Sequence, residues 1–196
     1  MKIDKALRKQ NRNKKIYFIS MFFLAMFLPM ITFLASIKSK FILIFLLIIE
    51  VLIFLSIIIK INYYKLEFMC TINRLRFSNG LFSNKNLVLC DKVAIIHTNK
   101  DKEDMEIIIV TNMKFKNKKL KPITKGFVRN YPEIEKEYKK LQKRNPEIVY
   151  YFQIVRRGAL KKYLMLDQIY RNCVNASYTN SAIENIKIAR GQNDIF

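Results

Sequence analysis

Residues 16–59 read IYFISMFFLAMFLPMITFLASIKSKFILIFLLIIEVLIFLSIII, in which two apolar runs, 16–37 and 41–59, flank the tripeptide Lys-Ser-Lys at 38–40. Runs of 22 and 19 residues form helices roughly 33 and 29 Å long, which match a bilayer hydrocarbon core of about 30 Å. So short a connection permits only an antiparallel pair, because backbone exposed to lipid must satisfy its hydrogen bonds within the helix. The sequence therefore predicts a transmembrane hairpin over residues 16–60.

The distribution of basic residues predicts the orientation of this hairpin. The tail, residues 1–15, carries seven Lys and Arg, and the second run is followed by Lys60 and Lys65, whereas the tip has only Lys38 and Lys40. Because basic loops are retained in the cytoplasm, we expect a protein integral to the cell membrane with both termini cytoplasmic. A cleaved signal peptide is disfavoured, since its apolar region spans only about 7–15 residues and ends at a small-x-small site that is missing here.

Glu50 is the one acidic residue within the apolar runs, close to the middle of the second. A carboxylate at the bilayer centre costs about 2.5–3.5 kcal/mol, so we expect Glu50 to be protonated or to face a partner helix. One interpretation is an ion-linked site or an oligomer contact, and the other is a tolerated neutral glutamate. We favour the second, because transport usually needs several intramembrane polar groups and more helices than one hairpin.

Residues 61–196 are predicted to form a cytoplasmic α+β domain. The net charge of +21 coexists with a mean hydropathy of +0.02, because the apolar hairpin offsets a strongly basic remainder. Apolar and polar residues alternate over 66–72, and the tripeptide Ser-Asn-Gly at 78–80 is typical of a hairpin turn. Residues 66–111 are therefore expected to form one antiparallel sheet, with later strands at 87–89, 93–97 and 107–110.

Part of this region resembles a known family. Residues 74–85 read Arg-Leu-Arg-Phe-Ser-Asn-Gly-Leu-Phe-Ser-Asn-Lys, and residues 87–96 read Leu-Val-Leu-Cys-Asp-Lys-Val-Ala-Ile-Ile. This pattern resembles the bacterial PH-like domains that follow paired transmembrane helices, through Gly80, Leu81, Phe82, Lys85, Asp91, Lys92 and Val93. The resemblance implies a membrane-proximal, partly open barrel used for binding, and it does not imply catalysis.

The segment 113–131 is the densest run of one charge sign, and no acidic residue occurs from Ile107 through Pro132. Aromatic residues interleave with its basic residues, which are Lys114, Lys116, Lys118, Lys119, Lys121, Lys125 and Arg129. Nucleic acid is an unlikely partner because no RNP, helix-turn-helix or KH pattern is present. We expect contact with anionic lipid headgroups, which lie nearby in a membrane-anchored chain. A solvated lysine-rich loop is equally compatible with the sequence.

The remainder of the chain predicts one more strand and three helices. A helix begins at Pro132 and ends at Asn145, with glutamates early and basic residues late, as the helix dipole favours. Residues 148–155 are read as a core strand and residues 160–175 as an amphipathic helix. The sequence Ser-Ala-Ile-Glu at 181–184 is typical of a capping box that starts the last helix.

No residue pattern in the chain predicts catalysis, a metal or a cofactor. The three cysteines, Cys70, Cys90 and Cys173, have no zinc-ligand spacing and are expected to be buried thiols. His97, the single histidine, is expected to be structural. We therefore expect a non-enzymatic, membrane-anchored scaffold that presents its basic domain to a protein partner or to a second copy. The alternative is an accessory subunit of a membrane transport or secretion complex.

The expected topology gives a direct labelling test. In a chain with its native cysteines replaced, a cysteine placed at Ser39 should react with an impermeant thiol reagent added outside intact cells. Cysteines placed at Asn99 or Gly191 should react only after the membrane is opened. The opposite pattern would contradict the predicted orientation.

Overall fold

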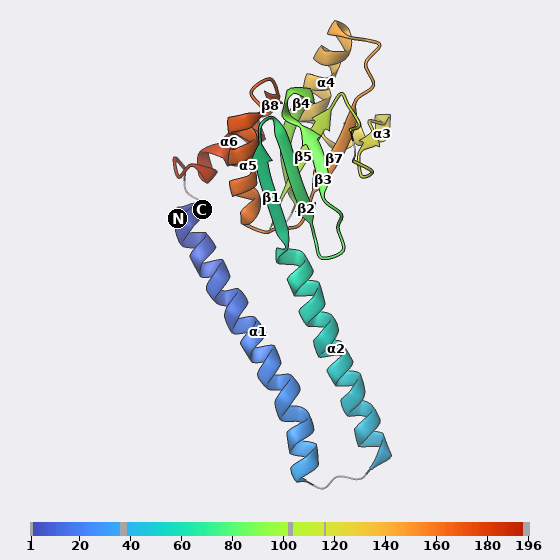
Figure 1. Ribbon diagram of the computed structural model, residues 1–196, viewed down its shortest axis with the longest axis vertical. Helices are drawn as coiled ribbons and strands as arrows, with labels where there is room; N and C mark the ends of the chain where they lie inside the picture. Colours follow the sequence, from blue (N-terminus) through green and yellow to red (C-terminus); the bar gives the residue numbers. More distant parts are fainter. Residues whose placement is uncertain (1, 36–38, 102–103, 116, 194–196) are drawn as a thin grey trace.

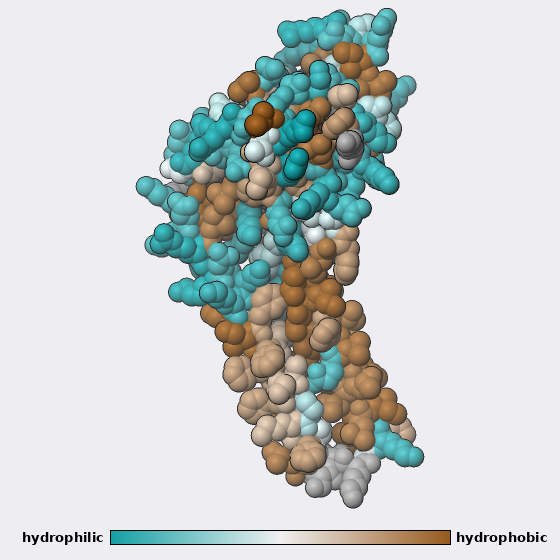
Figure 2. Space-filling view, in the orientation of Figure 1, coloured by the Kyte–Doolittle hydropathy of each residue, from teal (hydrophilic) through white to brown (hydrophobic). Residues whose placement is uncertain are grey.

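The computed structural model describes residues 2–35, 39–101, 104–115 and 117–193, and it consists of a long helical hairpin and an α+β head (Figure 1). We call residues 65–193 the head. The hairpin helices, α1 (Ile3–Leu34) and α2 (Lys40–Tyr64), are both long and apolar enough to cross a membrane. Figure 2 shows the corresponding contrast between an apolar hairpin surface and a hydrophilic head. The basic tail is the first part of α1, because the helix continues through it without a break.

Polar contacts join the two helices at the end nearest the head. The Tyr17 and Ser56 hydroxyls are 2.6 Å apart, and Ile53, one turn earlier on α2, is buried. The Lys60 ammonium lies 5.4 Å from the centre of the Tyr17 ring and 5.7 Å from that of Tyr64. These amphipathic side chains suit the boundary between apolar and polar surroundings.

The first sheet follows α2 after a single residue. Its strands, in spatial order, are β1 (Leu66–Thr71), β2 (Arg74–Asn79) and β3 (Asn86–Leu89), and both pairings are antiparallel. The predicted turn at 78–80 is wrong, because Ser78 and Asn79 are the last residues of β2. The hairpin turns instead at Ile72 and Asn73, whose φ angles of 38° and 64° suit a two-residue turn of type I′.

Hydrogen bonds to Asn73 explain why this turn is used. Its carbonyl accepts from the Cys90 N–H and its side chain accepts from the Asp91 N–H, each at 2.9 Å. The end of β3 therefore holds Asn73 in the left-handed conformation, which asparagine tolerates better than most residues. Gly80 instead begins a longer loop between β2 and β3.

The second sheet has five strands in the order β6-β7-β5-β4-β8. Their bounds are Val93–Asp101 for β4, Asp104–Thr111 for β5, Lys121–Pro122 for β6, Tyr151–Val155 for β7 and Ser177–Tyr178 for β8. The pairing of β4 with β8 is parallel and the others are antiparallel. The single sheet expected over residues 66–111 is thus divided in two, because the short 3₁₀ helix η1 (Cys90–Lys92) separates β3 from β4.

The central strand β5 is buried on both faces and separates two apolar cores. Ile107 and Ile109 join the first sheet and the last two helices, α5 (Lys161–Asn172) and α6 (Asn180–Ala189). Ile108 and Val110 point to the other face, into a core shared with α3 (Lys125–Asn130) and α4 (Pro132–Arg144). Alternate side chains of one strand therefore hold both helical layers.

The helices of the head agree with those predicted from the sequence except at two points. Helix α4 begins at Pro132 as predicted, whereas α3 lies in the segment interpreted as a lysine-rich loop. Helix α6 is capped by Thr179, whose hydroxyl accepts from the Ala182 N–H, and not by Ser181. Ser181 takes part instead in a polar cluster described below.

The tail of α1 is packed against the head. Ile3 and Ala6 are each 4% exposed, Ile3 belongs to the core that contains α5 and α6, and Leu7 packs against that core. One turn later, the Gln10 side chain accepts a hydrogen bond of 3.1 Å from the backbone N–H of Leu160. The tail is therefore an integral part of the head's packing.

An ion pair buried within the head lies where α2 enters it. The Lys162 side chain is fully buried, and its ammonium lies 2.7 Å from Asp104 Oδ2 and donates to the carbonyl of Arg156 at 2.6 Å. The same carboxylate oxygen accepts from the hydroxyl of Tyr63, in the last turn of α2, at 3.0 Å. Burial lowers the pKa of Lys162, and the hydrogen bond with Asp104 opposes that shift.

Candidate functional site

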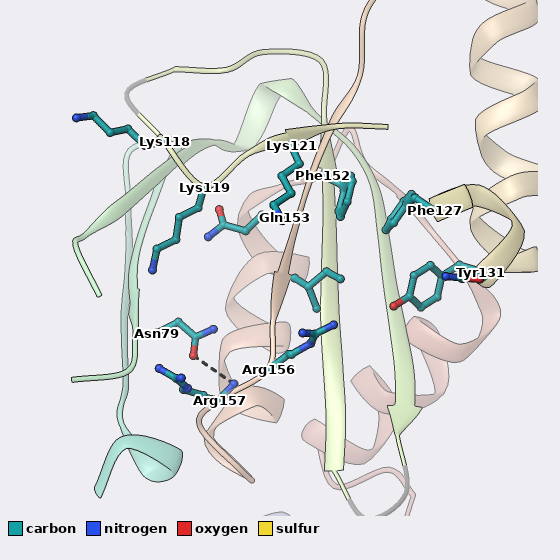
Figure 3. Close-up of a pocket in the computed structure, with 12 residues that line it drawn as sticks. Asn79, Lys118, Lys119, Lys121, Phe127, Tyr131, Phe152, Gln153, Arg156 and Arg157 are labelled. Carbon is teal, nitrogen blue, oxygen red and sulfur yellow. Dashed lines mark hydrogen bonds between the residues drawn. The ribbon is translucent and has the colours of Figure 1, made fainter. Parts of the chain in front are cut away.

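The head contains a cavity of about 770 Å³ beside β6 and β7 (Figure 3). Its lining combines basic, aromatic and amide side chains, namely Asn79, Lys118, Lys119, Lys121, Phe127, Asn130, Tyr131, Phe152, Gln153, Ile154, Arg156 and Arg157. In Figure 3 the three lysines lie toward one end and the two arginines toward the other, while the aromatic rings form one side. The cavity therefore has basic groups at both ends and an apolar wall between them.

The aromatic wall is ordered by ring contacts and by a helix cap. Thr124 begins α3 by accepting the backbone N–H of Phe127 at 3.3 Å. This places the Phe127 ring against Phe152 of β7, with centroids 3.7 Å apart and planes at 18°, and the Tyr131 ring 5.1 Å from Phe127. These contacts limit the rearrangement of the wall.

A buried amide pair supports the lysine end. Gln153 of β7 is 5% exposed and Asn117 is 3% exposed, and the Asn117 amide donates to Gln153 Oε1 at 2.7 Å. Asn117 Oδ1 also accepts from the backbone N–H of Lys119 at 3.0 Å. The backbone from which Lys118 and Lys119 project is therefore fixed to the sheet.

The arginine end is fixed to the hairpin. The Arg157 guanidinium donates to Asn62 Oδ1, in the last turn of α2, at 3.0 Å, and its backbone N–H donates to Asn79 Oδ1 at 3.2 Å. Gly80 makes this approach possible, because at φ 103° a Cβ there would collide with the Arg157 guanidinium and lie 2.7 Å from Asn62 Oδ1. The cavity thus reaches the residues where α2 meets the head.

The charge around the cavity is strongly positive. Among the described residues that line it, five are basic and none is acidic. Arg156 is partly neutralised by Glu106, with 2.7 Å between Nε and Oε1, whereas Lys118 and Lys121 make no ion pair within the described part of the chain. The lysine end is therefore well suited to a negatively charged group.

The residues predicted to bind anionic lipid lie at different places in the structure. Lys118, Lys119 and Lys121 line the cavity together, while Lys125 and Arg129 line a second hollow of about 420 Å³ beside α4. Lys114 is exposed and lines neither space, and Lys116 lies outside the described residues. In Figure 1, α3 lies apart from the end of α2.

Sequence reasoning missed the arginine end of the cavity. Arg156 and Arg157 directly follow the strand predicted over residues 148–155 and were assigned no role, and Asn79 was assigned to a turn. The three residues belong to segments almost 80 positions apart, and Arg157 N to Asn79 Oδ1 is the contact that joins them. The adjacent pair of arginines was the available signal, although its meaning depends on pairing between distant strands.

Glu50 lies in a shielded position in the hairpin. Its Oε1 atom is inaccessible to solvent and has no hydrogen-bond partner in the described part of the structure. It lies one turn from the buried Ile53 on α2. This oxygen is therefore directed into the hairpin, although Glu50 as a residue is only half-buried.

A polar cluster around His97 links β4 to α4 and α6. Its Nδ1 atom lies 3.0 Å from the Thr179 hydroxyl, 3.1 Å from the Ser181 hydroxyl and 3.7 Å from Glu133 Oε2. The Ser181 hydroxyl donates to the same Glu133 oxygen at 3.0 Å. A catalytic triad places the nucleophile and the acid on different ring nitrogens. All three groups share one nitrogen here, so the arrangement is that of a structural network.

Two pKa shifts follow from this packing. Burial lowers the pKa of His97 below its ordinary value, although the charge of Glu133 opposes the shift. Burial alone would raise the pKa of Glu133, but hydrogen bonds from the Ser181 backbone and hydroxyl lower it overall. The folded protein therefore favours a neutral His97 beside a charged Glu133.

The three cysteines are close together in the main core. The sulfurs of Cys70 and Cys90 are 3.8 Å apart, and Cys173 belongs to the same core. Burial raises the pKa of Cys70 to about 12, and the interaction with Cys173, together with burial, raises the pKa of Cys90. Cys90 and Cys173 are buried as expected, whereas Cys70 is partly accessible. Among the described residues no group of His, Cys, Asp or Glu is arranged to hold a metal ion.

Comparison with known proteins gives no relative from which a function can be transferred. No protein-family model, no curated protein and no solved structure matches this chain. The function is therefore inferred from the cavity and from its place beside the hairpin.

The lowered pKa of His97 predicts a pH-dependent stability. The unfolded chain binds a proton at His97 near pH 6.5, whereas the folded chain binds it only at lower pH. The free energy of unfolding should therefore fall as pH decreases below this value, by at most about 1.4 kcal/mol per pH unit. Thermal unfolding of the full-length protein, followed by circular dichroism between pH 7 and 5.5, measures this slope. In His97→Gln the contribution should vanish, and an unchanged slope would assign it to other groups.

Proposed function

We propose that this chain is a non-enzymatic binding protein anchored in the cell membrane, whose head holds anionic lipid headgroups in the basic cavity. The observation that carries the proposal is the cavity lining, which has five basic and no acidic side chains among the described residues. Lys and Arg side chains converging on one space form charge-assisted hydrogen bonds with phosphate oxygens. We further propose that both termini are cytoplasmic, so that the head faces the anionic inner leaflet.

The location of the arginine end favours a lipid source for the anion. Asn62, which accepts from Arg157, follows Ile59, the end of the uninterrupted apolar run in α2, by three positions. In a helix this is about 4.5 Å along the axis, which falls within a polar layer about 5–7 Å thick on each side of the hydrocarbon core. In a hairpin that spans the bilayer, Arg157 lies at the depth of the lipid phosphates.

The architecture is compatible with a PH-like role in binding. Two mainly antiparallel sheets directly follow the paired helices, and helices end the described chain. The parallel β4–β8 pair and the helix α3 are features of this head that the sequence pattern did not indicate. We propose a PH-like domain that also presents a surface to a protein partner or to a second copy.

The cavity can be tested by the lipids that remain bound to the full-length protein. The protein is reconstituted in vesicles of equimolar phosphatidylcholine and phosphatidylglycerol, re-extracted in mild detergent and analysed for lipid by mass spectrometry. We expect several-fold enrichment of phosphatidylglycerol and its loss in the triple variant Lys118→Gln, Lys119→Gln, Lys121→Gln. Added glycerol phosphate should compete, and high salt should weaken binding by screening.

A variant with the same loss of net charge distinguishes lipid binding in the cavity from attraction by the overall charge of the protein. Lys136, Lys143 and Lys187 are exposed on α4 and α6 outside the cavity, so their triple change to Gln removes the same net charge. This control should keep the enrichment. Equal losses in the two triple variants, or no enrichment in the wild type, would contradict the proposed site.

Glu50 supports a second candidate function, an accessory subunit of a membrane transport or secretion complex. Its Oε1 atom is shielded without a partner, and an intramembrane carboxyl of this kind is often functional. The change Glu50→Gln keeps the size and hydrogen bonding and removes the titratable proton. A binding protein should retain its crosslinked partners and its bound lipid in this variant. Recovery of transporter subunits at fixed stoichiometry, with activity lost in Glu50→Gln, would favour the second function.

A further inference from the structure

The loop between β2 and β3 exposes a large apolar side chain beside the hairpin. Phe82 is 91% exposed, and the loop that carries it runs from Gly80 to Lys85. In Figure 1 this loop lies level with the last turn of α2, at the end of the head from which the hairpin projects. Ile72, which is 93% exposed, lies at the opposite end of the same strands. Of these two exposed side chains, Phe82 is therefore the one beside the hairpin.

Three hydrogen bonds hold the loop in this position. The backbone N–H of Leu81 donates to Asn62 Oδ1 and that of Gly80 donates to the carbonyl of Lys65, each at 2.9 Å. At the other side of the tip, the Ser78 hydroxyl donates to the carbonyl of Ser83, also at 2.9 Å. The loop is thus fastened to the last turn of α2 and to the residue that follows it. Its depth is fixed relative to the hairpin.

That depth is within the membrane boundary in a hairpin that spans a bilayer. Asn62 lies about 4.5 Å beyond Ile59, the end of the uninterrupted apolar run in α2, and the polar layer is about 5–7 Å thick. Aromatic side chains are enriched in this layer, and long basic side chains extend from it into water. The loop carries a residue of each kind, the aromatic Phe82 and, three positions later, the exposed basic residue Lys85.

We propose that Leu81 and Phe82 insert into the boundary between headgroups and acyl chains, on the side of the bilayer where the head lies. The loop is then a third attachment of the head, in addition to α1 and α2. It sets the tilt of the head against the lipid and keeps the arginine end of the cavity at the membrane. The inference rests on the proposed membrane hairpin and not on which ligand occupies the cavity.

The absence of tryptophan from the chain makes a fluorescence test specific. The variant Phe82→Trp carries a single tryptophan and is reconstituted at full length in vesicles of equimolar phosphatidylcholine and phosphatidylglycerol. We expect blue-shifted emission, protection from acrylamide and strong quenching by lipids brominated near the headgroup end of the chain. Ile72→Trp is the matched control, equally exposed in the structure, and should emit as a tryptophan in water.

A third variant distinguishes failure of this inference from failure of the membrane hairpin. Phe54, an exposed residue in the middle of α2, gives Phe54→Trp, which should be quenched by lipids brominated deeper along the chain. If Phe54→Trp is quenched while Phe82→Trp behaves like Ile72→Trp, the loop does not insert and the proposal is overturned. If Phe54→Trp is not quenched, the hairpin itself is outside the bilayer and both proposals fail.

Discussion

The junction between the hairpin and the head depends on the contact between Lys162 and Asp104. The Lys162 side chain is fully buried, and Asp104, whose side chain is 29% exposed, also accepts the hydroxyl of Tyr63 from the hairpin. Removal of Asp104 would leave the buried ammonium without its charge partner, which is destabilising. Because Lys162 also binds the carbonyl of Arg156, this one contact fixes α2, β5, α5 and the arginine end of the cavity relative to one another.

The two adjacent arginines at this end of the cavity differ in the groups that they contact. Arg156 pairs with Glu106 and so contributes less net charge to the cavity, whereas Arg157 contacts only uncharged groups in its two hydrogen bonds, to Asn62 and Asn79. The lysine end has no such compensation within the described residues. An anion entering the cavity would therefore find a hydrogen-bonded arginine at one end and lysine side chains at the other, of which Lys119 donates to the Ser83 hydroxyl. A planar guanidinium and an ammonium on a flexible chain present different donor geometries to such an anion.

The elements that the sequence could predict are those determined by local pattern. The hairpin follows from two uninterrupted apolar runs, and α4 follows from Pro132 and its charge gradient, because both signals lie within one element. The turn at Ile72 and Asn73 was missed, since an isoleucine at positive φ is unfavourable alone and is held by Asn73 contacts with residues 90 and 91. Thr179 was missed as a cap because Ser181 fits the local motif equally well, and only the fold assigns Ser181 to Glu133 and His97. The cavity could not be predicted from the sequence without knowing which distant strands are neighbours.

The packing of the tail against the head has a consequence for the order in which the protein assembles. Gln10 bonds to Leu160, a separation of 150 residues, and Ile3 completes a core formed by segments from the end of the chain. During synthesis the apolar hairpin is complete long before residue 160 exists, so the apolar face of the first turns of α1 stays uncovered until the end of the chain is made. The step that completes the head must then bring together segments far apart in the sequence, and contacts between distant segments form slowly.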